Sequence, residues 1–241
     1  MNLTIISPAK NEADNLPELI KRISAVANKY HYRHEIIIVD DHSTDQTKKI
    51  IRRLQKNNPD LKIINSNGVG PGAAILTGVK HARFPVIITL DSDLSHDPEI
   101  IPAFVEKFIK TKSDLIIGSR FIKGGQANLP AFRLLLSKLA ASLVSLLTGH
   151  QLGDATSGFR IQTKKLLENL KLQNQGFALH LEIPLKAILG HYKITEVPIH
   201  YQKRKFGSSK MRPFKIGPSY LKVLFIELIK HNFAFLYQTS N

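Results

Sequence analysis

Short apolar runs alternate along the chain with longer segments in which apolar residues recur at helical spacing. This alternation is typical of an α/β fold with a mostly parallel sheet and flanking helices. It predicts strands at residues 3–7, 35–39, 61–65, 86–90 and 114–118. It predicts helices between them at residues 16–28, 44–57, 73–81 and 98–110.

The starts of two predicted helices carry capping residues. Ser43, Thr44 and Asp45 stand at the start of the second helix, and their side chains are of the kind that cap helix N-termini. Asp97 precedes the fourth helix and is followed by proline, the residue favoured at the first helical position. Both signals support the predicted strand–helix alternation.

Two later segments are more apolar than these helices. Residues 130–148 have only a thin polar side, and residues 220–237 are apolar but interrupted by charged residues. Neither offers the roughly 18 uninterrupted apolar residues of a membrane span. Each is either an amphipathic helix in a membrane interface or a helix that completes the core or a dimer contact. We expect one α/β domain over residues 1–215 and a C-terminal amphipathic helix over residues 216–241.

The composition adds a strong positive charge. The 241 residues include 34 Lys and Arg against 19 Asp and Glu, a formal net charge of +15. This excess implies a polyanionic partner: nucleic acid, nucleotide phosphates or an anionic membrane. Cysteine is absent, which excludes disulfides and Cys-based metal sites. The N-terminus lacks the basic and apolar regions of a signal peptide and is predicted to be the first strand.

Acidic residues gather at the predicted strand ends, although acids are scarce in this chain. They are Glu12 after the first strand, Asp40 and Asp41 after the second, and Asp91 and Asp93 after the fourth. Ligands of open α/β sheets bind beyond the carboxyl ends of the strands, and crowded carboxylates repel unless a cation compensates them. Oxygen ligands without His or Cys suit Mg²⁺ or Mn²⁺ held together with substrate phosphates. The alternative role for Asp91 and Asp93 is to cap the next helix, but Asp97 already fills that role.

A glycine-rich turn at residues 68–73, GVGPGA, matches the G-x-G-x-x-A pattern of dinucleotide-binding enzymes. It follows the third predicted strand rather than the first. Its prospective ribose ligand, Asp91, belongs to the acidic pair described above. A glycine-rich turn alone is weak evidence, so we do not favour a dehydrogenase.

Six segments resemble, in order, the motifs of family 2 glycosyltransferases with a GT-A fold. They are SPAKNEADNL, IIIVDDHSTDQT, GPGAAILTG, TLDSDLSHDPE, IIGSRF and DATSGFR, and the resemblance covers about residues 3–215. Within the family, the chain resembles dolichyl-phosphate mannose synthases and related polyprenyl-phosphate glycosyltransferases. This resemblance implies a metal-dependent, inverting transfer of a sugar, with mannose favoured, from a nucleoside diphosphate sugar to a polyprenyl phosphate.

The resemblance also implies partners and a location. GDP-mannose is the favoured donor and UDP-glucose the alternative. The acceptor lipid lies in a membrane, so we expect a protein bound peripherally to the anionic surface of the cytoplasmic face.

Individual residues of the nucleotide site follow from the same resemblance. It implies that Pro8, Lys10 and Glu12 line the nucleotide, with Lys10 standing where relatives often have an aromatic residue. Ile38 and Asp40 match the pair that binds the base.

The segment after the fourth strand matches the ribose and metal motif. Leu90, Asp91 and Ser92 match residues that contact the donor, and Asp93 matches the chief metal ligand, with Asp91 beside it. Ser95 stands where related synthases often carry Gln as a further metal contact. This difference predicts a weaker or altered metal site for Mg²⁺ or Mn²⁺.

Basic residues form the other half of the implied site. Arg120 ends the fifth strand, and Arg133 and Ser137 match contacts to the acceptor phosphate at the start of the first apolar segment. Arg204 and Lys210 match residues that close over the donor diphosphate. The alternative for the basic run around Arg204 is a solvated face or a nucleic-acid patch. No ladder of aromatic residues accompanies it, so we expect no nucleic-acid partner.

The implied chemistry needs no nucleophilic triad. An acceptor phosphate is already anionic at neutral pH, so it needs positioning and charge neutralisation rather than a strong base. Three alternatives stay open from the sequence. One is transfer to a saccharide hydroxyl with Asp154 as general base; the others are a nucleic-acid-binding module and a nucleotidyltransferase.

Overall fold

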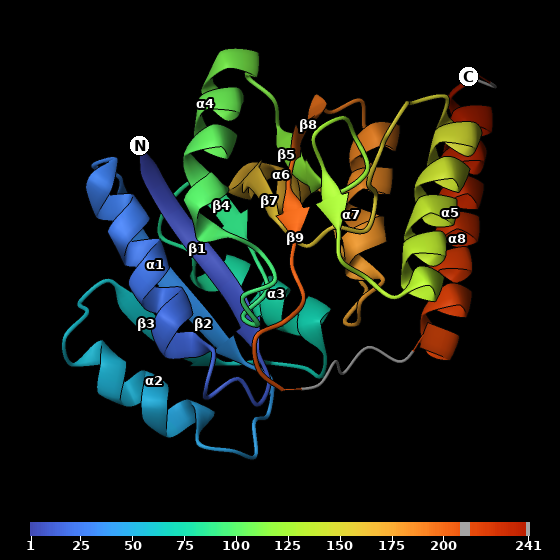
Figure 1. The fold of residues 1–241 in the computed structure, drawn as a ribbon. Helices are drawn as coiled ribbons and strands as arrows, with labels where there is room; N and C mark the ends of the chain where they lie inside the picture. Colours follow the sequence, from blue (N-terminus) through green and yellow to red (C-terminus); the bar gives the residue numbers. More distant parts are fainter. Residues whose placement is uncertain (208–212, 240–241) are drawn as a thin grey trace.

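A seven-stranded sheet forms the centre of the computed structural model, which describes residues 1–207 and 213–239 (Figure 1). Its strands are β1 (Asn2–Ala9), β2 (Arg33–Asp40), β3 (Leu61–Asn65), β4 (Val86–Thr89), β5 (Leu115–Ser119), β7 (Arg160–Thr163) and β8 (Ile194–Pro198). They lie in the order β3-β2-β1-β4-β7-β5-β8, and only β7 runs antiparallel to its neighbours. The predicted α/β class with a mostly parallel sheet is confirmed.

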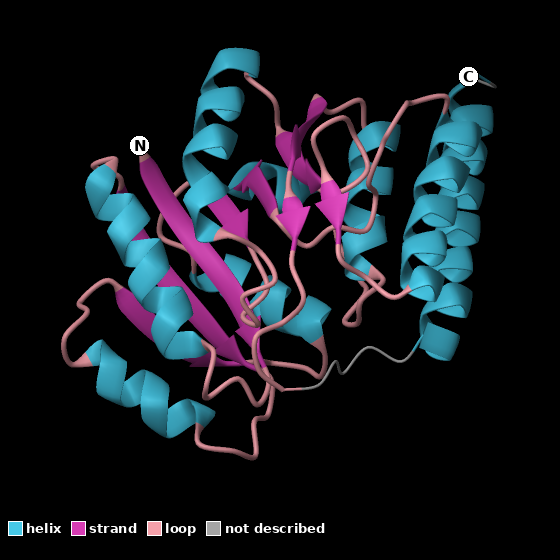
Figure 2. Ribbon diagram, in the orientation of Figure 1, coloured by secondary structure: helices cyan, strands magenta, loops and turns pink. Residues whose placement is uncertain are grey.

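Helices cover both faces of the sheet (Figure 2). One face is covered by α1 (Leu16–Lys29), α2 (Thr47–Gln55) and α4 (Ile101–Thr111). The other side carries α3 (Pro71–His81), α5 (Ala131–Thr148), α6 (Lys164–Asn169), α7 (Leu179–Leu189) and α8 (Pro213–Thr239). A second, two-stranded sheet joins β6 (Gln126–Ala127) to β9 (His200–Tyr201).

Two hydrophobic cores result, one on each face, because successive side chains of a strand point to opposite sides. Ile5 and Ile36 belong to the core under α1, whereas Ile6 and Ile37 belong to the core under α3. Strands buried on both faces read as continuous apolar runs rather than as alternating ones. This burial explains why the sequence predicts these strands clearly.

All five predicted strands and the four predicted helices are present, with shifts at the helix starts. The second helix begins at Thr47 rather than at residue 44, because Ser43 and Thr44 form hydrogen bonds with Asn11. Of the three predicted capping residues, Asp45 accepts a 2.9 Å hydrogen bond from the Thr47 N–H at the start of the helix. Asp97 caps as predicted, since its carboxylate accepts a 3.0 Å hydrogen bond from the Glu99 N–H. It caps a short 3₁₀ turn, η1 (Pro98–Ile100), that leads into α4.

The two strongly apolar segments are α5 and most of α8, which lie side by side at one end of the molecule (Figure 1). Both pack on α7, and α5 contributes Ala140, Ala141 and Val144 to the core while α8 contributes Tyr220 and Leu224. By its length and its mean hydropathy of 1.5, α5 is apolar enough to cross a membrane. The count of uninterrupted apolar residues in the sequence, by contrast, predicts no membrane span in this segment. Both helices therefore complete the core on one side, and on the other side they leave apolar side chains exposed.

Candidate functional site

Three loops meet at the carboxyl ends of β1, β2 and β4, which are neighbours in the sheet (Figure 1). The Glu12 N–H donates to the Thr47 hydroxyl at 2.9 Å, which joins the first loop to the second. The Ser92 hydroxyl donates to the Pro8 carbonyl oxygen at 2.8 Å, which joins the third loop to the first. The structure thus brings together the three acidic strand ends that the sequence singles out.

Asp93 lies at the centre of this loop cluster and is 5% exposed. Its Oδ1 accepts hydrogen bonds from the Ser95 hydroxyl at 2.5 Å and the Ser95 N–H at 3.0 Å. Its Oδ2 lies 2.8 Å from Arg204 Nη2, and Arg204 Nη1 lies 3.5 Å from Glu12 Oε1. Ser95 therefore orients Asp93, and Arg204 joins carboxylates from two different loops.

Asp91 stands beside Asp93, with its side chain 38% exposed. Its partial removal from solvent within the loop cluster and the neighbouring charge of Asp93 raise the pKa of Asp91 to about 7. The backbone N–H of Asp91 donates to His96 Nδ1 at 3.1 Å, so that nitrogen carries no proton. Burial lowers the pKa of His96 to about 4, so its ring is neutral near pH 7 and does not compensate the two carboxylates.

The residues of this cluster fit a divalent cation bound together with a nucleotide. Within residues 1–207 and 213–239, no group of three or more His, Cys, Asp or Glu side chains is placed to hold a metal. Mg²⁺ and similar ions are commonly held by one or two carboxylates, with substrate phosphates and water completing the shell. Asp91 and Asp93 supply such carboxylates, and their mutual repulsion favours a cation between them.

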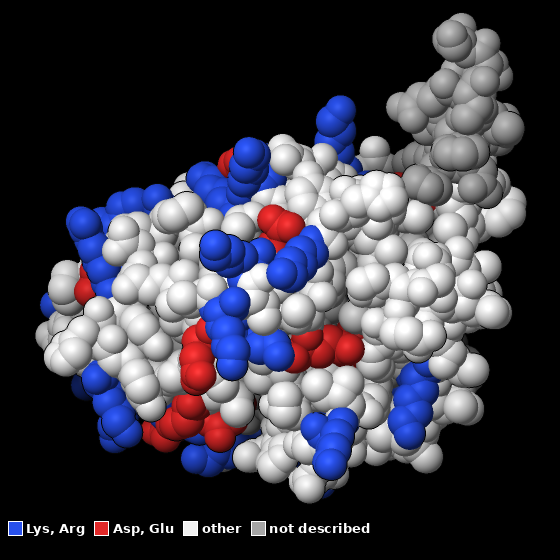
Figure 3. All heavy atoms as spheres, turned by 90° about the horizontal axis from the view of Figure 1, so that it is seen from above, with Lys and Arg blue, Asp and Glu red and all other residues white. Residues whose placement is uncertain are grey.

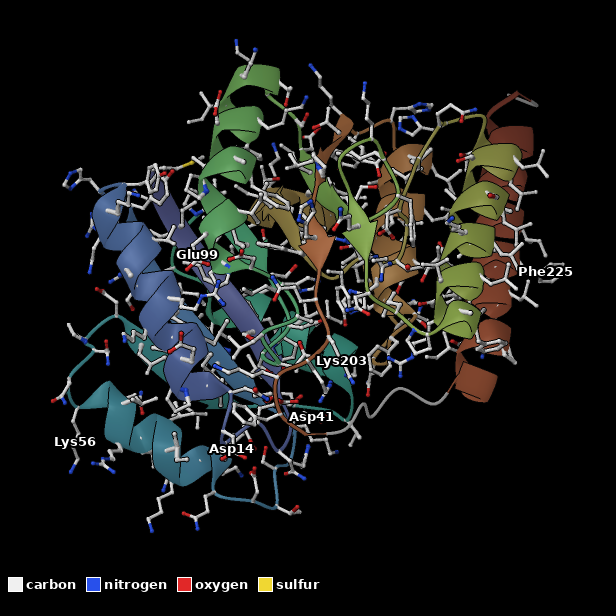
Figure 4. The ribbon with its side chains drawn as sticks, in the orientation of Figure 1. Asp14, Asp41, Lys56, Glu99, Lys203 and Phe225 are labelled. Atoms are coloured by element: carbon white, nitrogen blue, oxygen red, sulfur yellow. The ribbon has the colours of Figure 1, made fainter. Side chains whose placement is uncertain are left out.

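The second loop is rich in charge. The Asp40 carboxylate is buried, accepts from the Ser43 N–H at 3.3 Å and lies 3.3 Å from Lys48 Nζ. Lys10 lies 3.8 Å from Asp41, an acid to which the resemblance assigns no role. Figure 4 labels Asp41 near the lower end of the sheet.

Two predicted donor-site residues lie inside the protein. Ile38 packs in the core within β2, and Leu90 packs in the same core just after β4. Both are almost completely buried, so neither side chain reaches the surface of the loop cluster. In this structure they contribute by packing beneath the acidic residues that follow them.

The glycine-rich turn is closed by protein backbone. A Cβ on Gly72 would lie 2.6 Å from the Asn174 carbonyl oxygen, and one on Gly70 would lie 2.7 Å from the Gln175 carbonyl oxygen. The Ala73 N–H, at the start of α3, donates to the same Gln175 oxygen at 2.8 Å. The glycines thus admit a neighbouring loop rather than a pyrophosphate, which supports setting the dehydrogenase aside.

Arg120 and Asp154 form a buried pair on the other side of the site. Arg120 Nε and Nη2 lie 2.6 and 2.9 Å from the two carboxylate oxygens of Asp154. Asp154 also accepts from the backbone N–H groups of Arg120, Thr156 and Ser157. Burial alone would raise the pKa of Asp154, but Arg120 and these donors outweigh it and hold the pKa below its usual range. Both carboxylate oxygens are therefore engaged, and Asp154 fixes the Arg120 guanidinium.

The start of α5 approaches Arg120 through an aromatic ring. The Phe121 ring lies 5.1 Å from the Arg120 guanidinium carbon and 5.6 Å from Lys138 Nζ. Arg133 and Ser137 occupy the first two turns of α5 and are half-buried. Lys138, to which the sequence assigns no role at the site, is thus a second cation that contacts the Phe121 ring.

Further site residues escape the sequence analysis. Tyr201 packs against Arg120 and His96, and burial with the nearby carboxylates raises its pKa to about 12. His180, at the start of α7, lies near Asp91 across a glycine. No periodicity marks either residue, because their roles depend on contacts between distant segments. Lys210 lies outside the described residues.

The seven-stranded sheet with its flanking helices is a GT-A-like architecture, and a family model agrees with this class. The model described as glycosyl transferase family 2 matches residues 4–171. The chain belongs to glycosyltransferase family 2, and the predicted resemblance is confirmed.

Two curated relatives share this family. The chain is 37% identical over 216 residues to a dolichol-phosphate mannosyltransferase of Pyrococcus furiosus, covering 88% of this chain and 60% of that protein. It is 32% identical over 228 residues to a polyprenol monophosphomannose synthase of Mycolicibacterium smegmatis, covering 91% of this chain and 84% of that one. The chain thus spans less than two thirds of the first relative.

Solved structures share the fold at low sequence identity. Glucosyl-3-phosphoglycerate synthase of Mycobacterium tuberculosis, crystallised with Mn²⁺, UDP and phosphoglyceric acid, superposes with a TM-score of 0.71 at 18% identity. The alignment covers 94% of this chain and 78% of that one. It establishes the GT-A architecture.

Proposed function

We propose that this protein transfers mannose from a nucleoside diphosphate sugar to a polyprenyl phosphate, with GDP-mannose favoured over UDP-glucose. The observation that carries the proposal is the meeting of two opposite charge systems at one edge of the sheet. Asp91 and Asp93 form the acidic side, and the buried, fixed Arg120 forms the basic side. The names of the two curated relatives, which specify dolichol phosphate and polyprenol, support the lipid acceptor.

The acidic side binds the donor. Asp93, oriented by Ser95, and Asp91 would hold Mg²⁺ or Mn²⁺, which would neutralise charge on the donor diphosphate when bound. Arg204 already reaches Asp93 and Glu12, so it is positioned to pair with the leaving diphosphate, and we assign Lys210 to the same task. The relative crystallised with Mn²⁺ and UDP-glucose supports a divalent ion in such a site.

The basic side binds the acceptor. Arg120, with Arg133, Ser137 and Lys138 on α5, orients an anionic phosphate oxygen toward the anomeric carbon. That oxygen forms the new bond as the bond from the anomeric carbon to the diphosphate breaks, and the nucleoside diphosphate leaves with the electron pair. The attack comes from the opposite face and inverts the anomeric centre. Asp154 holds Arg120 and is not needed as a base, which argues against a hydroxyl acceptor.

The acceptor lies in a membrane, and α5 and α8 provide a surface for it. We call this surface the outer apolar face; it consists of Phe132, Leu135, Leu139, Leu146, Leu147, Leu221, Phe225 and Ile229. Figure 4 shows Phe225 projecting outward from α8. On the side shown in Figure 3, the end of the molecule formed by these helices bears few charged side chains. We infer peripheral binding to the cytoplasmic face through this surface.

Transfer assays test the proposal. The purified protein is incubated with GDP-mannose or UDP-glucose, Mn²⁺ or Mg²⁺, and polyprenyl phosphate in vesicles, and the glycolipid and released nucleotide are measured. We expect mannosyl lipid and GDP in equal amounts, and Asp93→Asn should lose most turnover while remaining folded. Release of pyrophosphate, transfer only to a saccharide, or full activity of Asp93→Asn in excess chelator would refute the proposal.

A further inference from the structure

Glu182 is a buried acid that the proposed mechanism does not use. It lies in the first turn of α7 and is 1% exposed. Burial alone would raise the pKa of its carboxyl group, but Lys186 and donors from the preceding loop outweigh burial and hold the pKa below its usual range. The side chain is therefore ionised at neutral pH. A buried charge needs several partners to offset its desolvation, so these partners indicate what Glu182 holds in place.

The Glu182 carboxylate holds the loop at residues 171–176. Its Oε1 accepts a 3.0 Å hydrogen bond from the Gln173 N–H. Its Oε2 accepts from the Asn174 N–H at 2.9 Å and from Asn174 Nδ2 at 2.7 Å. Lys186, one turn further along α7, lies 2.7 Å from Oε1 and balances the charge. Both the backbone and a side chain of the loop are thus fixed by one carboxylate.

This loop supports the glycine-rich turn at residues 68–73. The Gln175 carbonyl oxygen accepts from the Ala73 N–H at the start of α3, at 2.8 Å. Gly70 has a φ of 108°, a conformation that favours glycine, and a Cβ on Gly70 would lie 2.7 Å from the same oxygen. Loop and turn are therefore in close backbone contact, and a shift of the loop must shift the turn.

The glycine-rich turn in its own right fixes the second loop of the candidate site. The Gly70 N–H donates to Asp41 Oδ1 at 3.0 Å, and Asp41 is 5% exposed. The Asp41 N–H donates to the Ala9 carbonyl oxygen at the end of β1, at 2.7 Å. Asp41 Oδ2 lies 3.8 Å from Lys10, which the family resemblance places beside the nucleotide. Asp41 thus joins the turn to the first and second loops, directly after Asp40.

We propose that Glu182 is a positioning residue for the donor: through the loop at residues 171–176 and the glycine-rich turn, it sets the place of Asp41 and of the two loops that bind the nucleoside diphosphate. The inference rests on the function proposed above, and it adds a residue that governs donor affinity without touching the donor. It also gives the glycine-rich turn a role, which is to support the second loop. The acceptor side, built on Arg120 and α5, lies outside this chain of contacts.

Calorimetry and kinetics of Glu182→Gln test the inference. Gln keeps the size of the side chain but replaces one acceptor oxygen by an amide NH₂ group, which faces the donors of the loop. The Kd of GDP or UDP in Mn²⁺, whichever the wild type binds more tightly, should rise about 5- to 10-fold, the scale of one lost hydrogen bond. The KM for a soluble short-chain polyprenyl phosphate, at saturating donor, should stay within about twofold of the wild type.

Glu35→Gln is the matched control. Glu35 is also a fully buried, ionised glutamate, with a hydrogen bond from Thr4 and an ion pair to Lys62 at 2.7 Å. It lies near the start of β2, at the end of the sheet opposite to the three loops. Its replacement should lower the melting temperature as that of Glu182 does, but it should leave the Kd of the nucleoside diphosphate unchanged.

A double-mutant cycle with Asp41→Asn shows whether Glu182 acts through Asp41. If it does, the double variant should bind about as weakly as the weaker single variant, and the two losses should not multiply. Asn174→Asp, which places a second carboxylate against Glu182, displaces the loop from its surface and should weaken binding in the same way if Glu182→Gln fails to fold.

The outcomes separate this inference from the proposed function. Wild-type affinity in a folded Glu182→Gln or Asn174→Asp overturns the inference, as do losses that multiply in the cycle. An equal loss of affinity in Glu35→Gln, or an equal rise in the acceptor KM, overturns it as well. If the wild type binds neither GDP nor UDP, it is the proposed function that fails.

Discussion

Replacement of the outer apolar face by acidic residues should separate membrane binding from donor binding. Leu139 and Leu146 on α5 and Phe225 on α8 are 51%, 79% and 69% exposed, so glutamate at these positions should spare the core. Leu143 is less suitable, because it is half-buried and packs against the core cluster. We therefore choose the triple variant Leu139→Glu, Leu146→Glu and Phe225→Glu.

The magnitude follows from the area that these side chains still expose. Together they offer about as much surface as two fully exposed side chains, and burial of one such side chain is worth about 1.5–3 kcal/mol. Loss of all three should weaken membrane binding by about 3–6 kcal/mol, which is roughly 100-fold or more in partitioning. The net charge of +15 adds attraction to anionic headgroups, so binding of the wild type should also weaken as salt rises.

Vesicle flotation and transfer assays measure the effect. The triple variant should no longer float with vesicles that contain anionic lipid, and it should lose transfer to a long-chain polyprenyl phosphate. It should keep its affinity for nucleoside diphosphate and its activity on a soluble short-chain phosphate. Ile109→Glu is the matched control, since Ile109 is 61% exposed on α4, away from this face. Equal loss on both acceptors, or retention of vesicle binding, would refute the reasoning.

Three further substitutions test the site and its supports. Arg204→Ala should weaken nucleoside diphosphate binding about 10- to 100-fold, since a charge-assisted contact is worth about 1.5–3 kcal/mol. An unchanged Kd by calorimetry would show that Arg204 is a solvated surface residue without a role in binding the diphosphate. Asp154→Asn leaves Arg120 buried without its counter-charge and should lower the free energy of unfolding in urea by about 3–5 kcal/mol. The folded-state pKa of Asp154 lies below the unfolded value of about 3.9, so the stabilisation by the ion pair is present above about pH 3.9 and is lost as the pH falls through the folded-state pKa. The unfolding free energies of the variant and the wild type should therefore converge in acid. A difference that does not change with pH would contradict the pairing. Gly72→Ala should cost about 1–3 kcal/mol in thermal unfolding by pressing on Gln175, and an unaltered melting curve would contradict that packing.

The sequence predicts the first half of the fold well for a physical reason. Its strands are buried on both faces and read as apolar runs, whereas β7 is only four residues long and buries Arg160 and Gln162. With these polar residues, the sequence of β7 looks like that of a surface segment and is not recognised as a buried strand. Helix α7 is buried on most sides and contains Pro184, so it lacks the polar face by which periodicity identifies a helix.

The site divides in the same way. Acids at strand ends follow directly from the strand predictions, so Asp91 and Asp93 are found from the sequence. Arg204 lies 111 residues from its partner Asp93, and only the family resemblance connects them. Neither His180 nor the engagement of Asp154 by Arg120 has a local signal, because both depend on which segments pack together.

The antiparallel strand β7 has a consequence for how this enzyme can change. It lies between β4 and β5, so the residues after β4 that we assign to the donor and Arg120 after β5, which we assign to the acceptor, stand two strand spacings apart, about 10 Å. The segment that enters β7 carries Asp154 and Gly158 into that interval. In the proposed mechanism, nucleotide recognition and lipid recognition thus belong to separate parts of the sheet, joined by the segment that leads into β7. We expect the acceptor half to tolerate exchange with that of a relative while the donor half keeps its preference, so the fold allows new products to arise one half at a time.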